Sequence, residues 1–196
     1  MAYSLDSSKD SCYPGTTVLV NKLGLQEQAD LDAAERVAVA VHAVEIETAP
    51  PSGPFTFAYY LDLHRRLFQD LYDWAGTLRT INLSKKGTAF YPASELAELG
   101  EAKFRRLQSQ HEFRGLTRSA FVAAIADFYH ELNMLHPFRE GNGRTQRLFF
   151  TLLIRRAGYD IDFSACDTDL LMLSTIRAAH GVMTYLEAFF DESITP

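Results

Sequence analysis

The segment HPFREGNGRTQRLFF, residues 136–150, concentrates the unusual chemistry of this sequence. Within twelve residues it places a histidine, an acidic residue, two glycines around an asparagine and three arginines. The flanking residues predict helices, because residues 117–135 carry apolar side chains at the spacing of one helix face and a second helix is expected over about 143–157. The polar segment is therefore predicted to be a loop between two helices that bury their apolar faces.

Farther from this loop, the apolar pattern predicts more helices. They are expected over about 26–47, 55–73, 94–109, 167–179 and 182–190. For the first of them, the predicted buried face consists of Leu31, Ala34, Val37, Ala38 and Val41.

One segment reads as β structure. Residues 77–92, TLRTINLSKKGTAFYP, alternate on both sides of SKKG and predict a short hairpin with Gly87 in its turn. Residues 1–24 are expected to form a strap over the domain. The predicted fold class is all-α, a helical bundle with one small β-hairpin, in a single domain over residues 1–196.

Composition and charge limit the classes of protein to consider. The chain has 196 residues, 47% of them hydrophobic, and a formal net charge of -6, which argues against direct binding of nucleic acid. Cys12 and Cys166 are too few for a disulfide framework. The longest apolar run, LFFTLLI, has seven residues, whereas a membrane span needs about 20, and no signal-peptide pattern opens the sequence. We therefore expect a soluble cytoplasmic protein without a membrane partner; delivery into another cell remains an alternative.

The second half of the loop has the properties of a phosphate site. Gly141, Asn142 and Gly143 stand just before a helix, where successive backbone N–H groups and the positive end of the helix dipole favour an anion. Arg144 and Arg147 follow three residues apart and share a helix face. Two guanidinium groups beside a helix N-terminus predict a site for a polyphosphate.

The first half of the loop supplies groups for a reaction. Phe138 is expected to anchor the loop in the core. Glu140 would repel a phosphate unless Mg²⁺ lay between them, and Mg²⁺ is commonly held by one or two carboxylates and substrate phosphates. His136 could take a proton from an incoming hydroxyl. Each feature alone is common in turns and on helix surfaces; together they favour transfer of a phosphorus group from a nucleotide.

The loop also resembles a known motif. HPFREGNGRTQR matches the Fic family pattern H-x-F-x-[DE]-G-N-G-R-x-x-R at every specified position. The helical pattern, the upstream hairpin and YPGTTVLVNKLG near the N-terminus make the whole chain similar to stand-alone bacterial Fic toxins. The resemblance implies the Fic fold and transfer of AMP from ATP to a hydroxyl side chain of a target protein in the bacterial cytoplasm.

The resemblance also implies a role for each residue of the motif. His136 is the general base, Phe138 anchors the loop and Glu140 binds Mg²⁺. Gly141, Asn142 and Gly143 bind the α- and β-phosphates, and Arg144 and Arg147 hold the outer phosphates. The hairpin is the family's flap and clamps the target by strand addition. Its docking residues are Ser84, Lys85, Lys86, Gly87, Thr88, Ala89 and Phe90.

Partners follow from the same resemblance. Many relatives carry an inhibitory helix with the pattern [ST]-x-x-x-E-[GN]. Here Ser94 and Glu98 have the right spacing, but Leu99 stands at the last position. We therefore expect a separate small antitoxin to supply the inhibitory helix. Type II topoisomerase ATPase subunits are the expected target, as for similar toxins.

Three alternatives remain open from the sequence. The chain could be a nucleotide-binding interaction module without transfer activity, although binding alone needs no base such as His136. It could transfer UMP or GMP, because the base pocket cannot be identified from the sequence. It could also remove AMP from a modified target, although the missing inhibitory glutamate disfavours that reaction.

Overall fold

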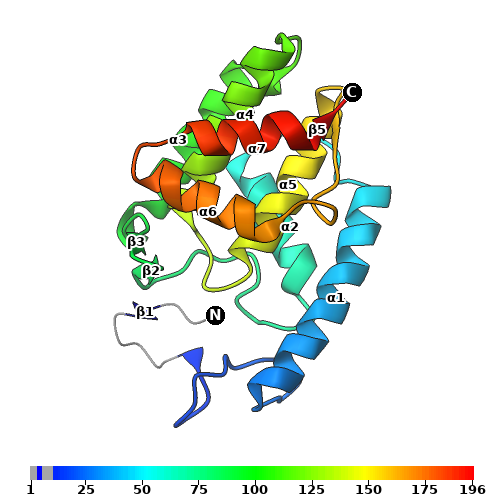
Figure 1. Cartoon of the computed structure of the whole chain (residues 1–196). Helices are drawn as coiled ribbons and strands as arrows, with labels where there is room; N and C mark the ends of the chain where they lie inside the picture. The colour runs from blue at the N-terminus through cyan, green and yellow to red at the C-terminus, as the bar shows by residue number, and fades with distance from the viewer. Residues whose placement is uncertain (1–3, 6–10) are drawn as a thin grey trace.

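Helices dominate the computed structural model, which describes residues 4–5 and 11–196. This part of the chain contains seven α-helices, and the all-α prediction is confirmed (Figure 1). Their bounds are α1 Gln28–Thr48, α2 Phe57–Phe68, α3 Leu96–Ser109, α4 Arg118–Leu135, α5 Asn142–Arg156, α6 Thr168–Ala179 and α7 Thr184–Ser193. None of them is long and apolar enough to cross a lipid bilayer.

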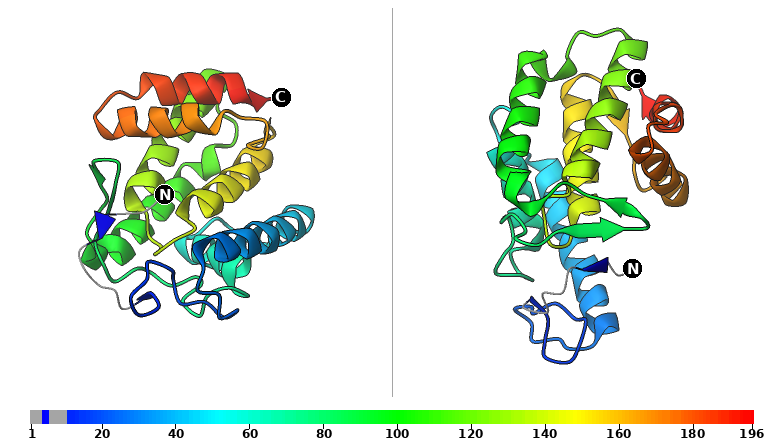
Figure 2. Two further views of the ribbon diagram at one scale, coloured as in Figure 1. Left: turned by 60° about the horizontal axis from the view of Figure 1, so that its bottom comes forward. Right: turned by 90° about the vertical axis from the view of Figure 1, so that its left-hand side faces the viewer.

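The predicted hairpin is present, and it has an additional strand. β2 (Leu83–Lys85) and β3 (Thr88–Ala89) pair antiparallel through a two-residue turn in which Lys86 and Gly87 both have positive φ. β1 (Ser4–Leu5) pairs antiparallel with the other edge of β2. The hairpin projects beside the helices in the right-hand view of Figure 2. The prediction overlooked a second small pair, β4 (Asp160–Ile161) and β5 (Ile194–Thr195).

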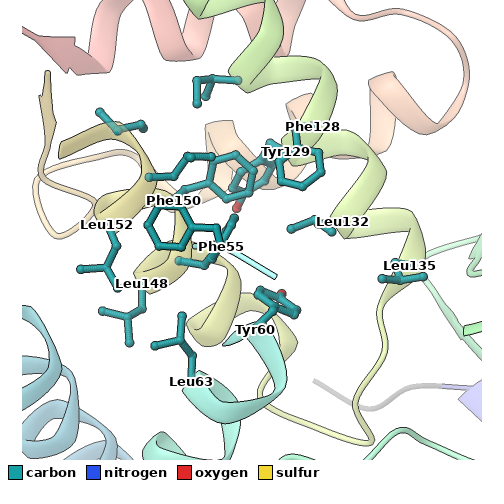
Figure 3. Close-up of a cluster of buried hydrophobic side chains, with 14 of the residues drawn as sticks. Phe55, Tyr60, Leu63, Phe128, Tyr129, Leu132, Leu135, Leu148, Phe150 and Leu152 are labelled. Atoms are coloured by element: carbon teal, nitrogen blue, oxygen red, sulfur yellow. The ribbon is translucent and has the colours of Figure 1, made fainter. Parts of the chain in front are cut away.

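Helices α4 and α5 form the centre of the core. Phe128 from α4 and Phe149 and Phe150 from α5 are fully buried and contact one another edge to face or at a tilt. Figure 3 shows aromatic and leucine side chains of α2, α4 and α5 converging on this cluster. Because the loop over 136–141 joins these two central helices, both of its ends are continuous with the buried core.

The buried face of α1 agrees with the prediction only in part: Leu31 is buried and Ala38 packs against the core, but the two predicted valines do not. Val37 and Val41 are 66% and 52% exposed, whereas Leu31, Glu35 and Val39 are buried. The inward face follows the four-residue spacing from Leu31 through Glu35 to Val39. It therefore includes a glutamate, which a prediction from apolar residues alone leaves out. The buried carboxylate finds its partners near the motif loop.

A left-handed turn anchors the far end of α5. Between α3 and α4, His111, Glu112 and Phe113 all have φ between 53° and 62°. The buried Glu112 accepts a hydrogen bond from the Phe55 N–H at 2.9 Å and lies 3.4 Å from Arg156 of α5. These contacts stabilise the Glu112 carboxylate in its buried position, where an unpaired charge would be costly.

The predicted strap, residues 1–24, lies partly outside the described residues. Within it, Cys12 and Leu19 form an antiparallel bridge, and Val18 and Leu19 are buried. The Lys22 N–H donates to the carbonyl of Leu71 at 2.8 Å, which joins this segment to the chain just after α2.

The contact between α1 and the residues after α2 should depend on pH. The His42 ring lies 3.1 Å from Glu45 and 2.9 Å from Asp70. Burial disfavours the charged imidazolium, but the two carboxylates outweigh burial and raise the pKa of His42 above 6.5. The contribution to stability is thus complete below about pH 6.5 and is lost as pH rises through the higher folded-state pKa.

We expect His42→Gln to destabilise the protein by less than about 1 kcal/mol, since the partners are exposed, and more at pH 5.5 than at pH 8.5. Urea unfolding of both proteins at the two pH values measures this. An equal loss at both would show that the imidazolium contributes nothing.

Candidate active site

The motif loop opens into a cavity of about 390 Å³. The hairpin, the end of α4, the start of α5 and one face of α6 line it. Six predicted site residues meet there: His136, Glu140, Gly141, Gly143, Arg144 and Arg147. Four predicted flap residues join them, Lys85, Lys86, Thr88 and Phe90. Phe138, Asn142, Ser84, Gly87 and Ala89 do not line the cavity.

Asn142 gives the loop its shape. Its side chain is 2% exposed and binds the backbone of Phe138 twice: Oδ1 accepts from the Phe138 N–H at 2.9 Å, and Nδ2 donates to the Phe138 carbonyl at 2.8 Å. A contact from Asn142 to a phosphate would therefore come from its backbone N–H. Phe138, the predicted loop anchor, is fully buried and stacks on Tyr60 and His64.

His64 of α2 contacts the backbone of the loop. This fully buried residue of α2 has its Nε2 3.0 Å from the carbonyl oxygen of Glu140, and its Nδ1 accepts from the Gly76 N–H at 2.8 Å. Burial lowers the pKa of His64 to about 3, although the Glu140 carbonyl opposes the shift. The ring is thus neutral, with its proton on Nε2 facing Glu140. The apolar spacing over residues 55–73 is consistent with a buried His64, but it gives no indication of this contact with the loop.

His136 is buried, and its ring is neutral. It ends α4 in the left-handed conformation, with φ 42°, and Arg79 Nε donates to its carbonyl at 2.7 Å. Its Nδ1 lies 3.2 Å from the Asn133 carbonyl, and its ring stacks on Phe90 at 3.8 Å. Burial lowers the pKa of His136 to about 3. A neutral ring that donates from Nδ1 carries its lone pair on Nε2, the nitrogen able to accept a proton.

Positive charge and backbone N–H groups gather at the start of α5. Gly141 precedes the helix with φ 81°, and Arg144 and Arg147 both reach the cavity. Glu140 Oε1 accepts from the Gly141 N–H at 2.9 Å and lies 3.6 Å from Arg144 Nη2. In this structure the carboxylate and the predicted anion site are therefore paired with each other.

Part of the cavity wall comes from residues that no sequence pattern had indicated. Tyr129 and Asn133 of α4 and Met172, Thr175 and Ile176 of α6 line it. The α6 residues follow the motif by more than twenty positions and carry no distinctive pattern. Only the packing of α6 against α4, which Figure 1 shows, brings them to the loop.

The hairpin forms one side of the cavity. Lys86, in the turn, lies 2.7 Å from the sulfur of Met172 on α6, and Phe90 covers the His136 ring. Lys85 and Thr88 face each other across the hairpin, and both line the cavity. The hairpin is thus placed beside the histidine.

Gly141 should tolerate no side chain. A Cβ there would lie 2.4 Å from the Phe68 ring, and the backbone has φ 81°. A left-handed non-glycine residue costs roughly 1–2 kcal/mol, and overpacking adds about 1–3 kcal/mol. We expect Gly141→Ala to lower the free energy of unfolding by the sum of both costs, measured by denaturant unfolding.

Gly115→Ala is the matched control, because Gly115 has φ 79° and no atom lies within 4 Å of the position that its Cβ would take. It should show the conformational cost alone. Equal destabilisation of the two variants would mean that the Phe68 ring moves aside.

Comparison with known proteins places these features in a family. Residues 54–154 match the family model described as Fic/DOC family. A probable protein adenylyltransferase, y4lH of Sinorhizobium fredii, is 38% identical, with 90% of this chain and 91% of the relative aligned. A probable protein adenylyltransferase, Fic of Escherichia coli, is 31% identical over 93% and 90%. The crystal structure of BepC from Bartonella tribocorum with bound AMPPNP superimposes with a TM-score of 0.90 at 27% identity, covering 95% and 97% of the chains. This chain therefore belongs to the Fic/DOC family.

Proposed function

We propose that the chain transfers AMP from ATP to a hydroxyl side chain of a target protein. The observation that carries the proposal is the shared cavity: the neutral base His136 and the positive start of α5 face the same space. The names of the relatives in Sinorhizobium and Escherichia coli support it, and so does the ATP analogue in the similar BepC structure.

The proposed reaction begins with the target hydroxyl. Its oxygen attacks the α-phosphorus of ATP, and Nε2 of His136 accepts its proton. The bond from the α-phosphorus to the bridging oxygen breaks, and pyrophosphate leaves with that electron pair. Arg144, Arg147 and the N–H groups at the start of α5 offset the charge that grows on the leaving group.

Glu140 is the proposed Mg²⁺ residue. Among the described residues no group of three or more acidic, histidine or cysteine side chains forms a protein-only metal site. A single carboxylate fits Mg²⁺, which is usually bound by few protein ligands together with substrate phosphates. The ion would supply positive charge to the phosphates, and Glu140 would exchange its contact with the Gly141 N–H for the ion, leaving that N–H to a phosphate.

The hairpin is the proposed docking site for the target, through its residues Ser84, Lys85, Lys86, Gly87, Thr88, Ala89 and Phe90. Strand addition needs an edge with unpaired backbone groups. Both edges of β2 are already paired, one with β3 and the other with β1. A target segment that pairs with β2 therefore has to replace Ser4 and Leu5.

Inhibition by a separate antitoxin, and hence a toxin role in the bacterial cytoplasm, is the next part of the proposal. Within residues 11–196, no carboxylate lies within 4.0 Å of the Arg147 guanidinium to form an ion pair. The chain also lacks a complete [ST]-x-x-x-E-[GN] segment. Type II topoisomerase ATPase subunits are the proposed target because of the resemblance to stand-alone toxins.

The decisive experiment uses ATP labelled at the α-phosphate, with Mg²⁺ and a bacterial lysate. The chain should label a protein band, and His136→Ala should reduce the rate by roughly 10²–10⁴-fold. The matched control is His180→Ala, at an exposed position outside the cavity.

Other outcomes separate the alternatives. Binding of ATP without a labelled band in any lysate would favour an interaction module. Label from UTP or GTP in preference to ATP would replace AMP by another nucleotide. Loss of label from a modified target would indicate removal of AMP.

The pH dependence tests the state of His136. Because burial lowers its pKa to about 3, the neutral form persists from pH 8 down to well below pH 6. With saturating Mg²⁺ and ATP, kcat/KM for the target should stay level between about pH 6 and 8. A fall with an apparent pKa near 6.5 would show that the ring titrates as an exposed histidine does.

A further inference from the structure

Glu35 is a buried acid that the proposed reaction does not use. It lies in the middle of α1 and is 7% exposed. Both carboxylate oxygens have partners: Oε2 lies 2.9 Å from Arg144 Nη1, and Oε1 accepts from the hydroxyl of Tyr72 at 3.2 Å. Burial and then the neighbouring Glu35 carboxylate raise the pKa of Tyr72, which keeps this hydroxyl protonated and able to donate.

Arg144 is held from three sides. Glu35 contacts Nη1, Glu140 lies 3.6 Å from Nη2, and the guanidinium carbon is 4.9 Å from the centre of the Phe68 ring. A guanidinium has five N–H donors in one plane, so contacts at known edges determine where the remaining donors point. Arg144 lines the cavity, whereas Glu35 does not. Glu35 therefore contacts the arginine from behind.

Stability alone does not account for this pair. Taking a carboxylate out of water costs several kcal/mol, and replacing a buried ion pair by apolar residues is often neutral or stabilising. The rest of this α1 face is apolar, with Leu31, Val39 and Ile46 buried. An apolar residue at position 35 would continue the pattern, so the glutamate is better explained by its effect on Arg144.

We propose that Glu35 is a positioning residue that holds the Arg144 guanidinium toward the outer phosphates of the bound nucleotide. The inference deepens the proposed function and rests on it. Glu35 touches no substrate; it acts through Arg144, and Tyr72 fixes its carboxylate.

Glu35 suits this role better than Glu140. The proposed binding of Mg²⁺ draws the Glu140 carboxylate away from Arg144. Glu35 lies on a different helix, behind the cavity wall, with both oxygens already engaged. It is therefore the carboxylate that keeps its contact with Arg144 when Mg²⁺ and ATP are bound.

The test separates position from charge. Glu35→Asp keeps the negative charge but withdraws it by one methylene group, which a mere counter-ion would tolerate. Glu112→Asp is the matched control, since Glu112 is also buried and contacts Arg156 at the other end of α5. Tyr72→Phe removes the second partner of Glu35 and should act in the same direction, less strongly. Thermal unfolding verifies that each variant is folded.

Binding is measured first, by calorimetry with Mg²⁺ and a non-hydrolysable ATP analogue or AMP. Glu35→Asp should weaken the affinity for the analogue roughly tenfold and leave that for AMP, which lacks the outer phosphates, unchanged. Arg144→Ala should weaken analogue binding at least as much. The double variant should bind no more weakly than Arg144→Ala, because the two residues act as one unit.

The transfer reaction gives the second readout. Glu35→Asp should lower kcat by roughly tenfold to a hundredfold, as expected for a displaced charge clamp, while Glu112→Asp leaves kcat unchanged. Three results would overturn the proposal. Glu35→Asp could lose affinity for AMP and for the analogue equally, or it could keep wild-type binding and kcat. The third result is that the losses of the two single variants add up in the double variant.

The two proposals can fail separately. A chain that binds the ATP analogue but transfers no AMP contradicts the proposed function, and the binding series still decides the role of Glu35. A wild-type chain that binds no nucleotide overturns both. If Glu35→Asp fails to fold, the comparison of Tyr72→Phe with wild type decides: unchanged analogue affinity and kcat overturn the proposal.

Discussion

The two hydrogen bonds between the Asn142 side chain and the backbone of Phe138 are the constraint on which the site depends. Both groups are buried, so neither can exchange its partner for water, and losing one bond would leave a polar group unsatisfied. These two bonds hold the chain between α4 and α5 in one fixed turn. His136 is thereby placed at the end of one helix and Gly141 at the start of the next, facing a common cavity.

The unusual composition of the loop thus has two physical causes. Phe138 and Asn142 are buried and shape the backbone, whereas His136, Glu140, Arg144 and Arg147 border the cavity. Gly141 both shapes the backbone and borders the cavity. Its positive φ leads into α5, and the lack of a Cβ lets the loop pack on Phe68. The nearby His64 completes the turn from α2, because it binds the Glu140 carbonyl and stacks on Phe138.

Much of this arrangement could be predicted because it is local in sequence. The helices on both sides of the loop, the hairpin around Gly87 and the grouping of His136 with Arg144 and Arg147 follow from spacing and turn chemistry. The wall formed by α6 could not be predicted, since Met172 and Thr175 carry no pattern that points to a cavity. Nor could β1 and the β4–β5 pair, two-residue strands whose pairing depends on distant chain segments.

The face predicted for α1 was right at Leu31 and wrong at Val37 and Val41, and the difference shows how such a prediction fails. The apolar count favoured Val37 and Val41, yet a charged residue, Glu35, is turned inward. Burial of a carboxylate is decided by partners far away in sequence, here Arg144 and Tyr72, and hydrophobic periodicity contains no information about them. The orientation of α1 therefore depends on the charges of the site: α1 can carry an acid on its buried face because Arg144 of the motif lies beside it.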